Sequence, residues 1–399
     1  MLQLSPLPIS LPAHLLKFYT PKNKDAMGGL LEDAKKTVQA AVAEIIQTYA
    51  PDKRVAIFAV EPAGRTRLTL KGETNLPEAR TALLDKLTAQ GIPFQDKIQV
   101  LPSAELGEKT YGVITISVAS IRSEPRDAAE LATQATLGAP VKLLKRQGLW
   151  CLIQTPDNYI AWADIGAIQW MTQSEYAAWQ HSPKAIYLQP NGYSYVAPLT
   201  YAQSVSDLVG GSILRLISEQ EHFLRVAYPD GREAFVASKE AKRYDAWLSS
   251  LQVNEQSLVY TAKTMMGLPY LWGGTSFKAV DCSGFTKTIY FMNGIIIPRD
   301  ASQQVHIGEL VDIANGFDQL RLGDLLFFGR PATDEASERV THVGMWLGNN
   351  EFIHASSYVR VASVRISAPN YDDFNLKRLL KVKRILNSST GHIVQLSQT

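Results

Sequence analysis

The stretch VDCSGFTKTIYFMNG, residues 280–294, contains Cys282, one of two cysteines in the chain. Apolar residues recur at helical spacing after this cysteine, and Asn293-Gly294 supplies a left-handed stop, so the pattern predicts a helix over Ser283–Asn293. Unpaired backbone N–H groups and the helix dipole favour negative charge at a helix N-terminus. We therefore expect the thiol pKa to fall from ~8.5 toward ~4–7, which would make Cys282 a nucleophile.

A nucleophilic cysteine needs a base, and two histidines downstream fit that role. His342 lies in THVGMWLG and His354 lies in EFIHAS, two strand-like segments joined by Gly348-Asn349-Asn350. If these residues form a hairpin turn, the two imidazoles lie nearly opposite one another on adjacent strands. The pattern predicts that His342 takes the thiol proton and that His354 hydrogen-bonds the other ring nitrogen of His342.

Two other uses of the cysteines stay open on pattern alone. Cys282, His342 and His354 could hold zinc, although a close ligand pair such as C-x-x-C or H-x-x-x-H is missing. Cys151 lies in the apolar run GLWCLIQ and reads as a small buried hydrophobe. A Cys151–Cys282 disulfide is conceivable in an oxidising compartment, but it would remove the reactive thiol.

Composition is that of an ordinary globular protein, with 46% hydrophobic and 20% charged residues among 399. The formal net charge of +2 and the lack of a long basic run argue against a nucleic-acid partner.

No apolar run approaches the roughly 20 residues that span a bilayer. The start, residues 1–24, lacks a signal-peptide pattern. We expect a cytoplasmic protein if Met1 is the natural start, or a periplasmic or cell-envelope protein if a signal was removed.

The chain reads as an α+β multidomain protein with four parts. Residues 1–110 alternate helical and strand patterns and carry no recognisable chemistry, which indicates a structural or interaction domain. Residues 111–182 and 183–250 each show short strands separated by turns in one recurring order, as in small SH3-like barrels. Residues 251–390 begin with a helix and continue with strands, and they contain Cys282 and both histidines.

Four strings in this last part occur in a familiar order: PYLWGGTSFKAVDCSGF, PRDASQQ, GDLLFFG and THVGMWLGNNEFIHAS. Together they resemble the NlpC-type, papain-like cysteine peptidases of bacterial cell-wall metabolism, over about residues 255–385. With SH3-like barrels in front, the whole is similar to the γ-D-glutamyl-L-diamino-acid endopeptidases, which trim murein peptides. The resemblance implies Cys282 as nucleophile, His342 as base and His354 as its orienting partner.

The resemblance also implies substrate contacts, because these enzymes require a free amine on the L-Ala of their substrate. A buried ammonium needs carboxylates and hydroxyls around it. The residues at the matching positions are Asp281 and Ser283 beside the nucleophile, Glu130 and Tyr159 of the first barrel, Trp272 as an apolar wall, and Asp300 and Ser302 on the glutamyl side. Tyr270 matches a tyrosine near the oxyanion.

The expected activity is hydrolysis of the γ-D-glutamyl bond to L-Lys or diaminopimelate through a thioester, with a murein peptide as partner and no metal or organic cofactor. One alternative is amide or acyl transfer, in which an amine takes the place of water on the same thioester. Another is a non-catalytic cell-wall-binding protein whose barrels bind the wall. The cysteine and histidine pattern argues against the second alternative.

Overall fold

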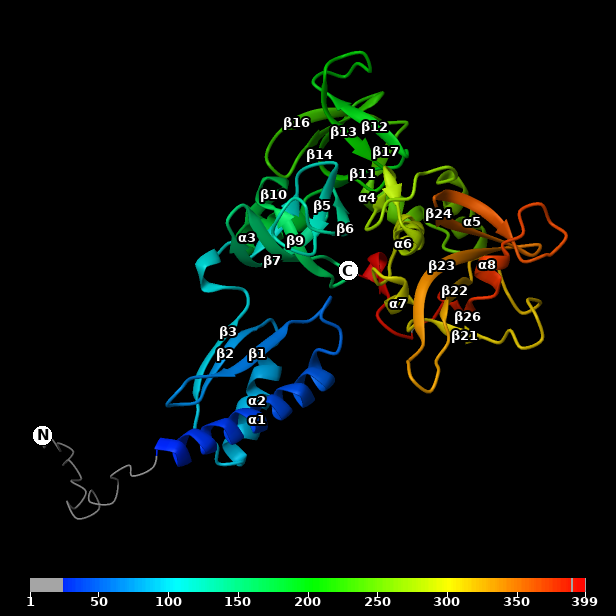
Figure 1. The fold of residues 1–399 in the computed structure, drawn as a ribbon. Coiled ribbons are helices and arrows are strands. Elements are labelled where there is room, and N and C mark those ends of the chain that lie inside the picture. The colour runs from blue at the N-terminus through cyan, green and yellow to red at the C-terminus, as the bar shows by residue number, and fades with distance from the viewer. Residues whose placement is uncertain (1–23, 389, 399) are drawn as a thin grey trace, which may run out of the picture. The chain divides into compact units, whose positions relative to one another are not determined.

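The computed structural model describes residues 24–388 and 390–398, which divide into two compact units with the boundary between Val100 and Leu101 (Figure 1). The segment in which we looked for a signal peptide lies outside the described residues, apart from Lys24. No helix within the described ranges combines the length and the apolar character that crossing a membrane requires.

The N-terminal unit packs two helices on one face of a three-stranded sheet (Figure 1). The predicted helix and strand patterns are confirmed, and Pro77 stands at the first turn of the second helix. Strand order is β1-β2-β3, with β2 and β3 parallel. The elements are α1 (Lys24–Tyr49), β1 (Phe58–Ala63), β2 (Thr69–Thr74), α2 (Pro77–Ala89) and β3 (Gln95–Val100).

The first barrel is a seven-stranded antiparallel sheet of order β10-β4-β7-β8-β9-β5-β6. Its strands are β4 (Tyr111–Ile114), β5 (Val118–Arg122), β6 (Leu131–Thr136), β7 (Pro140–Gln147), β8 (Trp150–Gln154), β9 (Ile160–Asp164) and β10 (Ile168–Met171), and α3 (Gln173–His181) follows. Residues 101–110 belong with this barrel, because Leu106 is part of its core and Ser103 hydrogen-bonds the Leu144 carbonyl. The boundary therefore falls earlier than residue 110.

The second barrel repeats this topology. Its strand order is β17-β11-β14-β15-β16-β12-β13, and each strand corresponds to the strand at the same place in the order of the first barrel. The elements are β11 (Lys184–Tyr187), β12 (Asn191–Tyr195), β13 (Ser204–Val209), β14 (Ile213–Glu219), β15 (Phe223–Ala227), β16 (Glu233–Ala237), β17 (Ala241–Arg243) and α4 (Tyr244–Ser250). The recurring pattern of short strands in the sequence is thus a true internal repeat.

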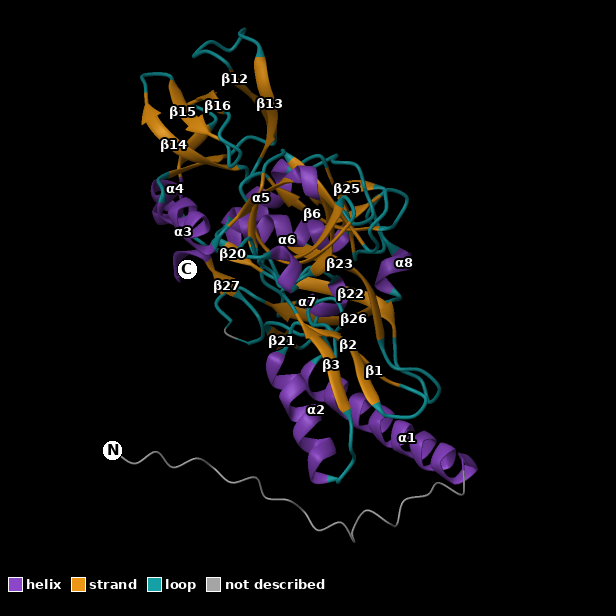
Figure 2. Cartoon of the chain, turned by 90° about the vertical axis from the view of Figure 1, so that its left-hand side faces the viewer, coloured by secondary structure: helices purple, strands orange, loops and turns teal. Residues whose placement is uncertain are grey.

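The C-terminal domain is built on a six-stranded antiparallel sheet of order β21-β26-β22-β23-β24-β25 (Figure 2). Its helix α6 packs against β23 and β24, and this contact forms the centre of the core. The remaining elements are α5 (Glu255–Thr264), β18 (Thr275–Ser276), β19 (Ala279–Val280), α6 (Cys282–Met292), β20 (Ile295–Ile296), α7 (Ala301–Gln304), β21 (Glu309–Val311), β22 (Leu325–Arg330), β23 (Arg339–Gly348), β24 (Glu351–Ser356), β25 (Tyr358–Ser363), α8 (Asp373–Leu376), β26 (Leu379–Arg384) and β27 (Val394–Gln395).

Polar contacts join the first barrel to this domain at β6. The Gln134 side chain accepts hydrogen bonds from Thr275 N at 3.0 Å and Ser276 Oγ at 3.0 Å, and its own backbone bonds the Thr275 hydroxyl. All three residues are buried, so each polar group needs these partners. The contact holds the barrel beside the segment that leads to α6.

Candidate active site

Cys282 occupies the first position of α6, as the sequence predicts. Asp281 caps the helix, and its Oδ1 accepts a hydrogen bond of 2.7 Å from Gly284 N. The helix approaches the preceding loop so closely that a Cβ on Gly284 would lie 1.9 Å from the carbonyl oxygen of Gly274. Glycine is therefore required at position 284, and the loop fixes the start of the helix.

The thiol pKa corrects the sequence-based expectation. Burial raises the pKa of the Cys282 thiol to about 12, and the negative charge of Asp281 adds to the rise. Backbone N–H groups of Val343 and Ser283 hydrogen-bond the sulfur and oppose the shift without reversing it. Since the residue is only 7% exposed, loss of solvation outweighs the helix N-terminus, and the resting site holds a thiol.

The two histidines meet across the β23–β24 hairpin, as predicted. Asn349 and Asn350 both have positive φ, 52° and 63°, as a two-residue type I′ turn requires. Met345 pairs with Ile353, which places His354 on the same face as His342, two residues out of register. The His342 Nε2 atom lies 2.8 Å from the His354 Nδ1 atom. The predicted hydrogen bond between the two rings is confirmed.

Both imidazoles are neutral at ordinary pH. Burial lowers the pKa of His342 to about 3, with the neighbouring His354 and Arg378 adding to the effect. Burial also lowers the pKa of His354 to about 4. His342 directly precedes Val343, whose N–H bonds the sulfur, so the residue that carries the neutral imidazole adjoins a group in contact with the thiol.

Arg299 organises the loop before the nucleophile, a role that the sequence pattern did not reveal. Its side chain is 1% exposed, and its guanidinium Nη2 lies 2.6 Å from Asp281 Oδ2. The Nη1 atom also donates to Ser283 Oγ at 3.0 Å, and Nε donates to Thr133 of β6. The Asp281 carboxylate accepts a further hydrogen bond from Gly273 N, so its contacts are with groups of the protein itself.

Tyr159 of the first barrel reaches the catalytic domain at Asp300. Its hydroxyl donates a hydrogen bond of 3.3 Å to Asp300 Oδ2, and Asp300 lies 3.7 Å from the Arg299 guanidinium. A buried ion pair holds the same loop, because Lys287 of α6 lies 3.0 Å from Asp157. The structure therefore brings together Tyr159, expected at the substrate amine, and Asp300, expected on the glutamyl side.

Glu130 and Trp272 also meet between the barrel and the catalytic domain. The Trp272 Nε1 atom donates a hydrogen bond of 2.6 Å to Glu130 Oε1. Trp272 is 61% exposed, so it is a surface aromatic and not part of the core. An exposed indole beside a carboxylate offers both apolar and anionic surface to a ligand.

Tyr270 and Ser302 lie in the elements that flank the nucleophile. Tyr270 forms a bridge to Val280, two residues before Cys282, and burial together with the charges of Cys282 and Asp281 raises the pKa of its hydroxyl. This group therefore stays protonated and can donate a hydrogen bond. Ser302 is half-buried on α7.

Cys151 is buried in the core of the first barrel, and burial raises the pKa of its thiol to about 12. Neither cysteine forms a disulfide. In the described ranges, no three His, Cys, Asp or Glu side chains are grouped so that they could hold a metal ion.

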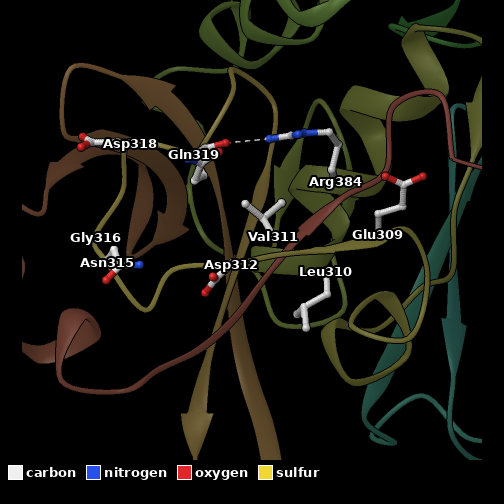
Figure 3. A pocket seen from close by; sticks show the side chains of 9 residues that line it. All are labelled: Glu309, Leu310, Val311, Asp312, Asn315, Gly316, Asp318, Gln319 and Arg384. Carbon is white, nitrogen blue, oxygen red and sulfur yellow. Dashed lines mark hydrogen bonds between the residues drawn. The ribbon is translucent and has the colours of Figure 1, made fainter.

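A separate pocket lies along β21 and the loop that follows it (Figure 3). Its single cationic lining residue, Arg384, is paired with Asp324 and also donates to the Gln319 carbonyl. None of the site residues predicted from the sequence lines this pocket. The other residues are Glu309, Leu310, Val311, Asp312, Asn315, Gly316 and Asp318.

A cysteine at a helix N-terminus, with a coupled imidazole pair on the neighbouring hairpin, defines a cysteine peptidase site. Residues 267–384 match the model of the NlpC/P60 family, and residues 121–168 match that of the bacterial dipeptidyl-peptidase Sh3 domain. The chain belongs to the NlpC/P60 family and is a hydrolase with an SH3 domain before its catalytic domain.

Individual relatives agree with this assignment. The chain is 31% identical to a γ-D-glutamyl-L-lysine dipeptidyl-peptidase of Bacillus cereus, over 61% of this chain and 73% of the relative. A Bacillus subtilis protein of the same name is 29% identical, over 56% and 72%. The crystal structure of a Bacillus cereus NlpC/P60 protein superimposes with a TM-score of 0.58 at 27% identity, covering 69% of this chain and 99% of the other.

Two residues that shape this site, Lys287 and Asp157, were missed from the sequence. Arg299 stands inside the PRDASQQ string, so its position beside Asp300 was a usable signal. Lys287 reads as an ordinary helix residue, and its partner Asp157 reads as a turn residue. No local pattern links these two across the chain.

Proposed function

We propose that the protein is a peptidase that cleaves the bond between γ-D-glutamate and the diamino acid, L-Lys or diaminopimelate, in murein peptides with a free N-terminal L-Ala. Two contacts carry this proposal. His342 pairs with His354, and the N–H of the next residue, Val343, contacts the Cys282 sulfur. The names of the two Bacillus relatives support the substrate class.

In the proposed reaction, Cys282 Sγ attacks the γ-glutamyl carbonyl carbon while its proton passes to His342. The N–H of Cys282 and the Tyr270 hydroxyl stabilise the oxyanion. His342 then gives the proton to the departing amine, the C–N bond breaks, and a thioester remains. Water attacks the thioester as His342 takes its proton, the C–S bond breaks, and His342 returns a proton to the sulfur.

Because both resting groups are neutral, the proton moves during the attack and not before it. A thiol of raised pKa is a poor nucleophile by itself, whereas the neutral imidazole has a free lone pair for the proton, although its lowered pKa makes it a weak base. The imidazolium that forms on His342 keeps its hydrogen-bond contact with His354. Catalysis therefore depends on Cys282 and His342 acting together.

The substrate ammonium is assigned to Asp300, with Tyr159 and Glu130 completing its surroundings. Asp300 and Tyr159 already lie at hydrogen-bond distance, and Glu130 accepts a hydrogen bond from Trp272 of the catalytic domain. Asp281 was expected in this role. Its carboxylate is neutralised by Arg299 and caps α6, so we assign it and Ser283 to shaping the pocket, with Trp272 and Ser302 on the glutamyl side.

Incubation with L-Ala-γ-D-Glu-L-Lys tests the proposal. Release of free lysine supports hydrolysis, and formation of a conjugate with an added amine would indicate acyl transfer instead. If the wild-type protein releases no lysine and forms no conjugate, the proposed reaction is wrong and a wall-binding role takes its place.

A further inference from the structure

The second ring nitrogen of His354 faces a carboxylate that the reaction described above does not use. His354 is fully buried, and its Nε2 atom has no hydrogen-bond partner among the described residues. Asp372 Oδ2 lies 3.9 Å from this nitrogen. An approach of about 1 Å would bring the two atoms to hydrogen-bond distance. A buried N–H without a partner is costly, so the contact favours such an approach.

Asp372 is held in place from the opposite side. It caps α8, and its carboxylate accepts hydrogen bonds from Asn375 N at 3.0 Å and Asn375 Nδ2 at 2.7 Å. Its own N–H donates to the Ser363 carbonyl. Partial burial would raise the pKa of Asp372, but the hydrogen bonds from Asn375 outweigh it and leave the pKa below its usual range. The group is a carboxylate, which can only accept hydrogen bonds.

We propose that Asp372 is a positioning residue that sets the tautomers of both histidines and stabilises the imidazolium that forms on His342. An accepting carboxylate requires the His354 proton on Nε2, so Nδ1 of His354 must accept. Nε2 of His342 must then donate across the 2.8 Å contact. The lone pair of His342 is thereby confined to Nδ1, which is left to take the thiol proton.

The other charges near the two rings make this carboxylate necessary. Arg360 on β25 is paired in register with His354, and Arg378 next to β26 acts on His342; both disfavour an imidazolium. Asp281 favours one, but Arg299 neutralises it. Asp372 also faces the histidine pair. Unlike Asp281, it has no guanidinium at ion-pair distance among the described residues, so its charge remains available to the two rings.

The test compares Asp372→Asn with Asp373→Asn. The first replacement removes the carboxylate charge but keeps a good helix cap, and the second removes the same charge from the next residue, which binds Lys377. Both are made in a Cys151→Ala background, so that alkylation reports on Cys282. Alkylation by iodoacetamide is followed across about pH 5 to 9 without substrate, and kcat and KM are measured on L-Ala-γ-D-Glu-L-Lys.

We expect Asp372→Asn to slow alkylation roughly tenfold across this pH range, with the rate still rising with pH because the thiol pKa lies above the range. We also expect kcat to fall roughly tenfold or more while KM changes by less than about twofold. Asp373→Asn should match the parent in both. A D372N protein with the alkylation profile of D373N would overturn the proposal; if D372N fails to fold, Asp372→Ser keeps the cap and gives the same comparison.

The catalytic part of this inference rests on the proposed function, but the two can fail separately. If the wild-type protein does not cleave the tripeptide, the proposed substrate is wrong, whereas the alkylation profile still tests Asp372. If the protein cleaves the tripeptide and D372N is unaffected in both measurements, the positioning role is wrong and the proposed function stands.

Discussion

The guanidinium of Arg299 lies 2.6 Å from the carboxylate of Asp281, the residue directly before the nucleophile. Arg299 is 1% exposed and Asp281 is 6% exposed, so neither charge has water to solvate it. Taking one member away leaves the other as an uncompensated buried charge. The start of α6 therefore depends on an ion pair that spans two segments of the catalytic domain.

Replacing Arg299 by methionine should lower the free energy of unfolding by roughly 3–5 kcal/mol, measured by urea denaturation. The control is Arg243→Met, because Arg243 forms a solvent-exposed pair with Asp245 that contributes little to stability. Adding Asp281→Asn to Arg299→Met should recover part of the loss, since it removes the stranded charge. Equal losses for the two arginine variants would contradict the role given to this ion pair.

Replacing Cys282 by alanine should abolish release of lysine from the tripeptide and leave the melting temperature within a few degrees of the parent. The thiol is the group that forms the thioester, and alanine fits the same space. Cys151→Ala serves as control, because Cys151 lies in the first barrel core, and it should retain activity. Full turnover by the Cys282 variant would remove the assigned nucleophile.

Replacing Asp300 by asparagine should lower kcat/KM for the free-amine tripeptide roughly 10- to 100-fold, because a charged hydrogen bond to the substrate ammonium is lost. N-acetylation of the tripeptide should have at least as large an effect on the parent enzyme. Asp127→Asn removes a charge from an exposed position of the first barrel and should change little. An enzyme that cleaves the acetylated peptide normally would refute the amine pocket.

Acid should destabilise the protein through its buried imidazoles. The pKa of His354 is lowered to about 4, from about 6.5 in an unfolded chain. Between these values the unfolded chain binds a proton that the folded chain does not, so stability is complete above about pH 6.5 and falls as the pH drops toward 4. The loss is at most about 1.4 kcal/mol per pH unit for each such histidine.

Urea denaturation at about pH 7.5 and about pH 4.5 measures this effect, with His354→Asn as the comparison. The variant has one buried imidazole fewer, so it should lose less stability between the two pH values than the parent does. Identical losses in parent and variant would show that His354 is not the group responsible.

Replacing Gly284 by alanine should destabilise the protein by roughly 1–3 kcal/mol or more and reduce activity, because the new Cβ would overlap the Gly274 carbonyl. Gly29→Ala is the matched control, since Gly29 lies in α1 with no atom within 4 Å of a Cβ there. That control should be neutral or slightly stabilising. A Gly284→Ala protein as stable as the parent would contradict the close approach of α6 to its loop.

Local patterns in the sequence were sufficient for the architecture. Helical spacing after Cys282, the Asn349-Asn350 turn and the recurring short strands each depend on residues near one another in the chain. These features predicted α6, the β23–β24 hairpin and the two barrels. Counting outward from the Gly348-Asn349-Asn350 turn places the two histidines on the same face, so their contact was predictable as well. The two-residue turn alone would not give this register, which depends on the irregularity between Trp346 and Gly348.

The ionisation of the site was not predictable in this way. The helix N-terminus is a local feature and pointed to a thiolate at Cys282, but burial by β23 and its neighbours raises the thiol pKa instead. Burial is a sum over every segment that packs around a group. It becomes known only when the chain has folded.

The sequence by itself thus determined the elements, their order and the three residues at the reacting centre. Tertiary structure alone decided which polar and charged groups meet: Arg299 with Asp281 and Thr133, Lys287 with Asp157, and Asp372 with His354. Helix and strand periodicities come from backbone geometry that repeats over a few residues. An ion pair between distant segments leaves no such repeat, because its partners are brought together by the packing of whole domains.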